Sequence, residues 1–167
     1  LFFAGQACPT FYFWDSAELT AAIMNSGIPH APGFPFFLIL AKIWLAIMPD
    51  NPAHSLNIFS SFFAAIGLAV WFSVIQLIIK RSEIVKSAIL ISMASLIATI
   101  VMAISLTYSI QATRLEVYSL NFCGFALLTY IVLKISESAN FPYWWLGALT
   151  TIMGLFLVLP MVAILVT

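Results

Sequence analysis

Residues 55–79 read SLNIFSSFFAAIGLAVWFSVIQLII, a run that contains no Asp, Glu, Lys or Arg. A membrane core needs about 20 consecutive apolar helical residues, and uncharged polar groups can be satisfied within such a helix. We therefore predict a transmembrane helix here. The whole chain has the same character, with 63% hydrophobic residues, 7% charged residues and a mean hydropathy of +1.12. These values indicate an integral membrane protein and exclude a soluble domain.

Three further apolar runs predict transmembrane helices at residues 84–106, 115–134 and 143–166. The predicted fold class is therefore all-α, a polytopic transmembrane helix bundle that forms one domain over residues 1–167. The formal net charge is zero and no long basic run occurs. Nucleic acid is excluded as a partner, because phosphate backbones need clustered Lys and Arg, and the lipid bilayer is the partner that remains.

Both ends of the chain are apolar. Residues 1–13 are too short to span a membrane alone, and we interpret them as the end of a first span. Residues 155–167 stop within an apolar run. These features predict a fragment of a longer polypeptide, and the alternative is a small complete subunit.

Residues 14–54 are predicted to form a loop with interfacial helices. Its apolar part, residues 34–48, is interrupted by Lys42 and flanked by prolines, which favours a helix along the membrane surface over one that crosses. In that topology the basic residues beside the spans face the cytoplasm under the positive-inside rule. The Asp15 loop then faces outward from the plasma (inner) membrane. If residues 34–48 cross instead, this loop lies on the cytoplasmic side.

Two acids stand three positions apart in Trp14-Asp15-Ser16-Ala17-Glu18, at the start of a predicted short helix over residues 16–26. Acids kept beside a membrane are functional candidates, because a carboxylate in hydrocarbon costs about 3 kcal/mol or more. Residues three apart on a helix share a face. Asp15 and Glu18 are therefore candidate catalytic residues, one as a general base and the other binding a hydroxyl or a divalent cation. The alternative is structural: one caps the helix and the other complements its dipole.

A second polar group lies at residues 111–121, which read QATRLEVYSLN. In the favoured topology it faces the same compartment as Asp15. The i,i+4 spacing of Arg114 and Tyr118 predicts one shared helix face, whereas Glu116 points elsewhere. A cation opposite two carboxylates suits a phosphate leaving group. The alternative is an Arg114 that snorkels to lipid headgroups or pairs structurally with Glu116.

Cysteine and histidine form no metal motif. Cys8 and Cys123 lie in or beside apolar segments and are predicted to be small buried residues rather than a disulfide. His30 and His54 stand alone, so we predict no metal site and no cofactor. A divalent cation beside Asp15 is the alternative, although two acids alone make a poor metal site.

Four motifs occur in a fixed order: WDSAE at residues 14–18, HAPGFP at 30–35, LNIFS at 56–60 and EVYSLN at 116–121. This order resembles the family known as domain of unknown function 2723, with its W-D-S/C-G-E, H-P-P-G-Y-P, N-x-x-S and E-V-Y-x-L-N patterns. That family is protein O-mannosyltransferase-like and belongs with the GT-C membrane glycosyltransferases. The resemblance covers nearly the whole chain and identifies it as the N-terminal part of such a protein.

The resemblance implies a membrane glycosyltransferase that takes a sugar from a polyprenyl-phosphate donor on the outer face of the membrane. Asp15 becomes the general base for the acceptor hydroxyl, and Glu18 becomes a second acid of the site. The substrate-binding residues so implied are His30, Glu116 and Tyr118, which match the motifs, with Arg114 added by its charge alone. The family context also favours an interfacial helix at residues 34–48.

The sequence departs from the family pattern at three positions. Ala17 and Ala31 replace a Gly and a Pro, which are mild changes. Met153 stands where the family's last span has a His, and a thioether cannot act as an acid, a base or a charged donor. The alternative function is therefore a degenerate, non-catalytic accessory subunit of a larger membrane complex, energy-converting or other, whose partners are other membrane subunits.

Overall fold

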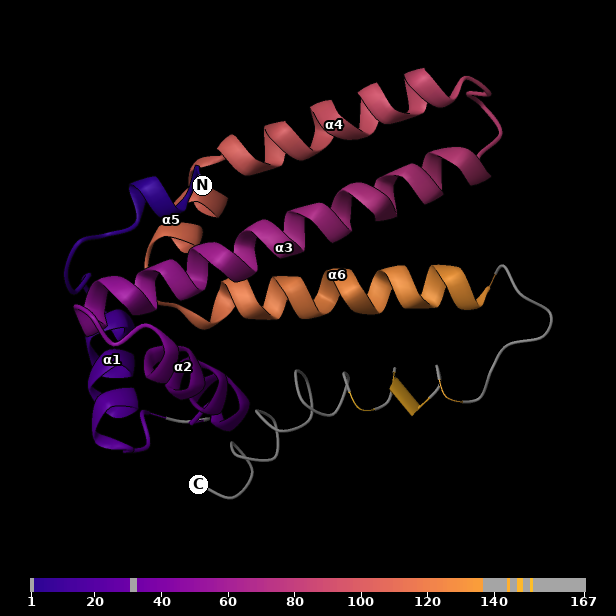
Figure 1. Ribbon diagram of the computed structural model, residues 1–167. Coiled ribbons are helices and arrows are strands. Elements are labelled where there is room, and N and C mark those ends of the chain that lie inside the picture. Colours follow the sequence, from indigo (N-terminus) through magenta and orange to yellow (C-terminus); the bar gives the residue numbers. More distant parts are fainter. Residues whose placement is uncertain (1, 31–32, 137–143, 145–146, 149–150, 152–167) are drawn as a thin grey trace.

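The computed structural model describes residues 2–30, 33–136, 144, 147–148 and 151, and the regular structure over them is helical (Figure 1). The elements are η1 (Ala4–Gln6), α1 (Asp15–Asn25), α2 (Pro35–Ile47), α3 (Pro52–Arg81), α4 (Ala88–Ile104), α5 (Leu106–Thr113) and α6 (Val117–Ile135). Helices α3 and α6 are long and apolar enough to cross a membrane, and the bent pair α4–α5 makes a third if it counts as one span. The prediction of an all-α, membrane-type fold is confirmed.

Helix α3 is the axis of the bundle, with α4 and α6 running along it (Figure 1). It begins three residues before the predicted span because Asn51 and Pro52 make a strong start signal. The Asn51 side chain accepts a hydrogen bond from the His54 amide at 3.4 Å, and Pro52 occupies a first-turn position where no amide hydrogen is needed. The 30 residues of α3 make it about 45 Å long, so it carries separate clusters of side chains at its two ends.

Gly67 sets the distance between α3 and α6. A Cβ at this position would lie 2.7 Å from Phe122 Cδ1 and 3.2 Å from Cys123 Cα on α6. Small residues let helix backbones approach closely in membranes, where packing replaces the hydrophobic drive for association. The close approach also leaves Cys123 buried, and both cysteines are free thiols.

Gly67→Leu is expected to lower the melting temperature in detergent, because the larger side chain forces α6 away from α3. Overpacking of this kind costs about 1–3 kcal/mol. Gly5→Leu is the matched control, since a Cβ at Gly5 meets nothing within 4 Å. Equal melting temperatures for the two variants, followed by circular dichroism, would show that the α3–α6 contact tolerates separation.

The predicted span at residues 84–106 is not one straight helix. Helix α4 begins at Ala88, and Ser105 takes an extended conformation that ends it. Helix α5 then continues at a 67° bend. Two hydrogen bonds to α3 hold the bend: Tyr108 donates to the Ala64 carbonyl at 2.7 Å, and Ser61 donates to the Ala112 carbonyl at 2.7 Å.

Helices α1 and α2 pack together at the N-terminal end of α3 (Figure 1). They share one core with α3 and α6, made of Leu19, Ile23, Phe37, Ala41, Leu56, Phe59, Leu115, Val117 and Leu120. Lys42, the charge that interrupts the apolar run of α2, donates to the carbonyls of Ile23 and Met24 at the end of α1, at 2.8 and 3.1 Å. The charge therefore has a packing role. The 13 residues of α2 reach about 20 Å, which is short of a hydrocarbon core.

The two predicted terminal spans have different outcomes. Over the described residues 2–13, the regular structure is the short helix η1, and Phe3 packs onto Ala64 and Leu68 of α3. A hydrogen bond from the Cys8 amide to the Thr113 carbonyl, 2.9 Å long, ties this segment to the end of α5. The predicted span at residues 143–166, including Met153, falls almost entirely outside the described residues.

Candidate functional site

Asp15 and Glu18 both lie in the first turn of α1, near the N-terminal end of the bundle. Trp14 is the N-cap, and no side chain caps the helix by a hydrogen bond. The capping alternative for Asp15 is therefore not what the structure adopts. Trp14 has φ 67° and ψ −137°, a sparsely populated conformation for a residue with a side chain, directly before the first acid. Backbone strain of this kind clusters at functional sites.

His30 comes from the loop after α1 and joins both acids. Its Nδ1 lies 2.7 Å from Glu18 Oε2, and its backbone amide donates to Glu18 Oε1 at 2.6 Å. Its Nε2 lies 3.9 Å from Asp15 Oδ2. Glu18 thus holds the imidazole from two sides, while 52% of the Asp15 side chain is exposed to solvent. The arrangement fixes the imidazole next to an accessible carboxylate.

The same three side chains are the one group of metal-ligating residues found in the described part of the chain. One ligand atom from each of Asp15, Glu18 and His30 lies within 4.8 Å of the others. Two carboxylates and one imidazole match the donor number of a catalytic zinc site. However, the 2.7 Å bond between His30 and Glu18 already engages the ring nitrogen nearest that acid. His30 Nε2 and the Asp15 carboxylate, 3.9 Å apart, are the ligand atoms that a cation can reach without breaking that bond.

Arg114 and Glu116 lie on an extended segment between α5 and α6. Asn57 Oδ1 accepts from the Leu115 amide at 2.7 Å, and Ser60 Oγ accepts from the Glu116 amide at 3.3 Å. These side chains of α3 take the place of the carbonyls that would continue the helix. The predicted i,i+4 helix face shared by Arg114 and Tyr118 is therefore wrong, because the two residues do not belong to one helix.

Electrostatics connect this segment to the first acids. Glu116 is buried, and its Oε1 lies 3.8 Å from Arg114 Nε. The pKa of Glu116 is raised, and burial is the main cause. The charge on Asp15 also raises this pKa, whereas the charges on Arg114 and His30 lower it. The two polar groups that the sequence separates by about a hundred positions thus act on each other at one end of the bundle. Tyr118 is exposed on the first turn of α6, with 54% of its surface open to solvent.

A cavity of about 460 Å³ lies beside this group of residues, between the N-terminal segment and α5. Its lining is mostly apolar and aromatic, with Arg114 as the charged member: Tyr12, Phe13, Trp14, Leu106, Thr107, Ile110, Gln111 and Arg114. The Arg114 guanidinium stacks 5.0 Å from the centroid of the Tyr12 ring and bonds Gln111 Oε1 at 3.2 and 3.3 Å. An apolar groove with one oriented cation suits an amphiphile that carries an anionic group.

Two residues with a large role in the site were recognised from the sequence only as part of a family motif. Asn57 and Ser60 form the N-x-x-S motif, yet nothing in an i,i+3 polar pair says what it binds. The structure shows that Asn57 also donates to the carbonyls of Cys8 and Thr10 at 2.8 and 3.0 Å. One buried side chain therefore joins the N-terminal segment, α3 and the segment that carries Arg114.

The His30–Glu18 pair predicts a measurable pH dependence. Hydrogen bonds from His30 lower the pKa of Glu18 from 4.5, and the hydrogen bond to Glu18 raises the pKa of His30 from 6.5. Because the pKa of His30 is raised in the folded protein, its contribution to stability is complete below the pKa of the unfolded state and is lost as the pH rises through the folded-state pKa. Because the pKa of Glu18 is lowered, its contribution is complete above the pKa of the unfolded state and is lost as the pH falls through the folded-state pKa. Both contributions are thus complete between about pH 4.5 and 6.5.

Glu18→Gln is accordingly expected to move the His30 pKa down towards 6.5, as followed by NMR titration of the imidazole. Glu83→Gln removes an exposed carboxylate at the far end of α3 and is the matched control. A His30 titration curve that is the same in the Glu18→Gln variant and the parent would show that the pair does not form in solution.

Comparison with known proteins gives one family. A family model described as the protein O-mannosyl-transferase TMEM260 N-terminal domain matches residues 15–167. The mouse (Mus musculus) protein O-mannosyl-transferase TMEM260 is 28% identical over 126 residues, which cover 74% of this chain and 16% of that protein. The chain therefore spans 16% of the length of this relative. No solved structure gives a significant match.

Proposed function

Because the chain belongs to the protein O-mannosyl-transferase TMEM260 N-terminal domain family, we propose that it forms the part of a membrane glycosyltransferase that binds the sugar donor and supplies the general base. The observation that carries the proposal is the placement of an accessible carboxylate, Asp15, at the same end of the bundle as an apolar groove that contains Arg114. Sugar transfer from a lipid carrier needs both features: a base for the acceptor and a cation beside a hydrocarbon chain.

The donor in this proposal is a polyprenyl-phosphate sugar, as the GT-C resemblance implies. The aromatic walls contributed by Phe13 and Trp14 suit an isoprenoid chain, and the Arg114 guanidinium suits the phosphate. Arg114 is only 12% exposed and is oriented by Gln111 and Tyr12, so it would meet the phosphate without reorganising. A hydrogen-bond donor that is already oriented towards the charge developing on the leaving phosphate is an effective form of transition-state stabilisation.

Asp15 acts as the general base in the proposed step. The acceptor hydroxyl gives its proton to the Asp15 carboxylate while its oxygen forms a bond to the anomeric carbon of the sugar. The bond between that carbon and the phosphate oxygen breaks, and the polyprenyl phosphate leaves with the electron pair. Arg114 stabilises the charge that develops on the leaving phosphate, so protons and electrons balance without any further reactant.

Glu18 and His30 serve as positioning residues. Glu18 holds the His30 ring and backbone through its two carboxylate oxygens. The Nε2 atom of His30 lies 3.9 Å from Asp15 Oδ2, so the ring that Glu18 holds lies beside the proposed base. Glu116 balances Arg114 within the same group of residues. Tyr118, exposed beside them, is assigned to the acceptor side.

The proposed orientation places this end of the bundle on the outer face of the membrane. Asp15, Arg114 and the groove lie towards the N-terminal end of α3, whereas Lys80 and Arg81 end the helix on the opposite side. The positive-inside rule assigns the lysine-rich end to the cytoplasm. Helix α2 then lies along the outer surface, consistent with its length.

The test of the function is transfer of labelled mannose to a Ser- or Thr-containing peptide by the full chain in membranes or nanodiscs. We expect transfer from polyprenyl-phosphate mannose and none from a nucleotide sugar. Transfer from the nucleotide sugar alone would overturn the donor assignment. No transfer from either donor, together with loss of a membrane complex on deletion, would favour the accessory subunit that Met153 suggests.

A further inference from the structure

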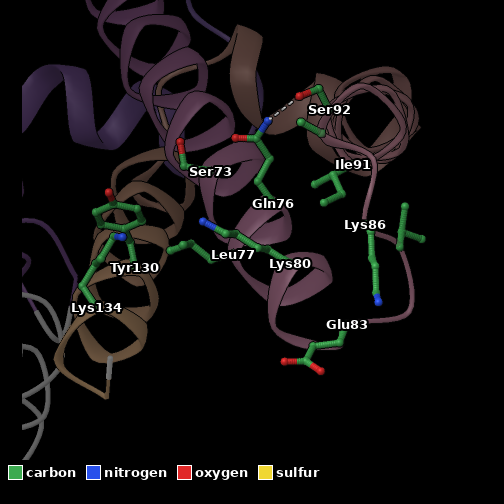
Figure 2. Close-up of a pocket in the computed structure, with 12 residues that line it drawn as sticks. Ser73, Gln76, Leu77, Lys80, Glu83, Lys86, Ile91, Ser92, Tyr130 and Lys134 are labelled. Atoms are coloured by element: carbon green, nitrogen blue, oxygen red, sulfur yellow. Dashed lines mark hydrogen bonds between the residues drawn. The ribbon is translucent and has the colours of Figure 1, made fainter. Parts of the chain in front are cut away.

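A second cavity lies at the opposite end of α3 from the candidate site. It has a volume of about 750 Å³ and is bounded by the C-terminal parts of α3 and α6, the α3–α4 loop and the first turns of α4 (Figure 2). Two lining residues are joined by a hydrogen bond of 3.1 Å from Gln76 Nε2 to Ser92 Oγ, which connects α3 to α4. In the sequence, the basic residues of this region indicate only the membrane topology.

Three lysines and one glutamate line this cavity, so its net charge is positive. They are Lys80 on α3, Lys86 in the loop, Lys134 on α6, and Glu83. Side chains on a helix lean towards its N-terminus, so lysines in the last turns of α3 and α6 lean back along the bundle. Figure 2 shows the Lys80 and Lys134 side chains extending into the same region between the helices. Among the described residues, neither Lys80 nor Lys86 forms a salt bridge.

The N-terminus of α4 adds to the positive potential. Ala88, the first residue of this 17-residue helix, lines the cavity. The first amide hydrogens of a helix have no partner within the helix, and they attract anions. The Ser87 side chain accepts from the Leu90 amide, so one amide of the first turn is already engaged. Lysines from three segments and a helix N-terminus therefore line the same cavity.

The remaining walls are apolar, which separates this site from a simple phosphate site. Leu77 and Ile91 line the cavity from α3 and α4. Beyond it, α4 exposes Ile89 and Met93, with 72% and 54% of their surfaces uncovered. The volume lies within the range of about 300–1,000 Å³ that holds drug-sized ligands, well above what a bare phosphate fills. The space suits a headgroup together with the beginning of its acyl chains.

We propose that the cavity among Lys80, Lys86, Lys134 and the start of α4 binds the phosphate headgroup of an anionic phospholipid from the membrane leaflet at that end of the bundle. Basic pockets between transmembrane helices are known recognition sites for such headgroups. The lipid would offset the like charges of Lys80 and Lys86 and tie α4, which makes few contacts outside α3 and α5, to the rest of the bundle.

The test is native mass spectrometry of the full chain released from nanodiscs that contain phosphatidylcholine with a minor fraction of phosphatidylglycerol. We expect selective retention of phosphatidylglycerol. Lys80→Gln should weaken retention about fivefold, because each lysine near anionic lipid contributes about 1 kcal/mol. Ala88→Trp should abolish retention of phosphatidylglycerol although it keeps every charge, because the larger side chain fills the cavity.

Arg81→Gln is the matched control. It removes one charge from the neighbouring position at the same end of the bundle, but Arg81 binds the Leu133 carbonyl and the Ser136 hydroxyl and does not line the cavity. Equal weakening by Arg81→Gln would mean diffuse surface charge and overturn the proposal. So would equal retention of phosphatidylcholine, or release of the lipid by inorganic phosphate. Lys80→Arg should bind as the parent does, and melting temperatures confirm that each variant is folded.

Discussion

Replacing Asp15 with Asn is expected to lower the turnover number for sugar transfer by about three orders of magnitude, within the range of 10²–10⁴ that general-base catalysis supplies. The amide has nearly the shape of the carboxylate but cannot accept a proton from the acceptor hydroxyl. The donor KM should change little, because the groove and Arg114 are untouched. The measurement is initial-rate transfer of mannose from polyprenyl-phosphate mannose at varied donor concentration.

Asp50→Asn is the control for this substitution. Asp50 is an exposed acid in the loop before α3, and the change is chemically identical. A normal rate in the Asp15→Asn variant would remove Asp15 from the catalytic role. A comparable loss in both variants would point to a general effect of negative charge on this face of the protein instead. The Glu18→Gln variant should retain more activity than Asp15→Asn, since Glu18 acts through His30.

The helices of the bundle could be predicted where hydrophobic length decides the structure. The apolar runs of α3 and α6 are long enough to cross a membrane, and a helix satisfies their backbone hydrogen bonds within hydrocarbon. Their ends shifted by a few residues because local signals such as Asn51 and Pro52 set helix starts. The bend at Ser105 could not be predicted, because serine is compatible with a continuing helix. The hydrogen bonds of Tyr108 and Ser61 to α3, which hold the bend, connect residues far apart in the sequence.

The sequence indicates which residues are candidates for the site, but not how they lie relative to one another. The spacing of Asp15 and Glu18 indicated a shared helix turn, and both acids lie in the first turn of α1. The contact of His30 with both acids depends on the conformation of a loop, which the periodicity of the sequence does not predict. The extended segment with Arg114 and Glu116 was predicted as helix, because its residues have no strong preference against one. The partners that hold it open belong to α3.

Asn57→Ala is expected to lower the free energy of unfolding by about 3 kcal/mol or more. Asn57 is 1% exposed and makes three hydrogen bonds: two to the carbonyls of Cys8 and Thr10, and one from the Leu115 amide. A buried group that loses its partner costs about 1–3 kcal/mol. The Cys8 carbonyl keeps a second partner in His54, at 3.0 Å, which limits the loss on that side. The measurement is thermal and denaturant unfolding in detergent.

Asn57 joins the N-terminal segment, α3 and the segment with Arg114, and we call this set of contacts the junction. The variants Ser60→Ala and Asn25→Ala distinguish the junction from ordinary helix packing. Ser60 makes one longer bond to the same segment, at 3.3 Å, so its loss should cost about 1 kcal/mol. Asn25 is exposed at the end of α1 and should cost almost nothing. If Asn57→Ala unfolds no more easily than Asn25→Ala, the segment with Arg114 is held by something other than the α3 side chains. If the predicted order holds, transfer activity should fall with stability along the same series, because the bonds that fold the junction also orient Arg114 towards the groove.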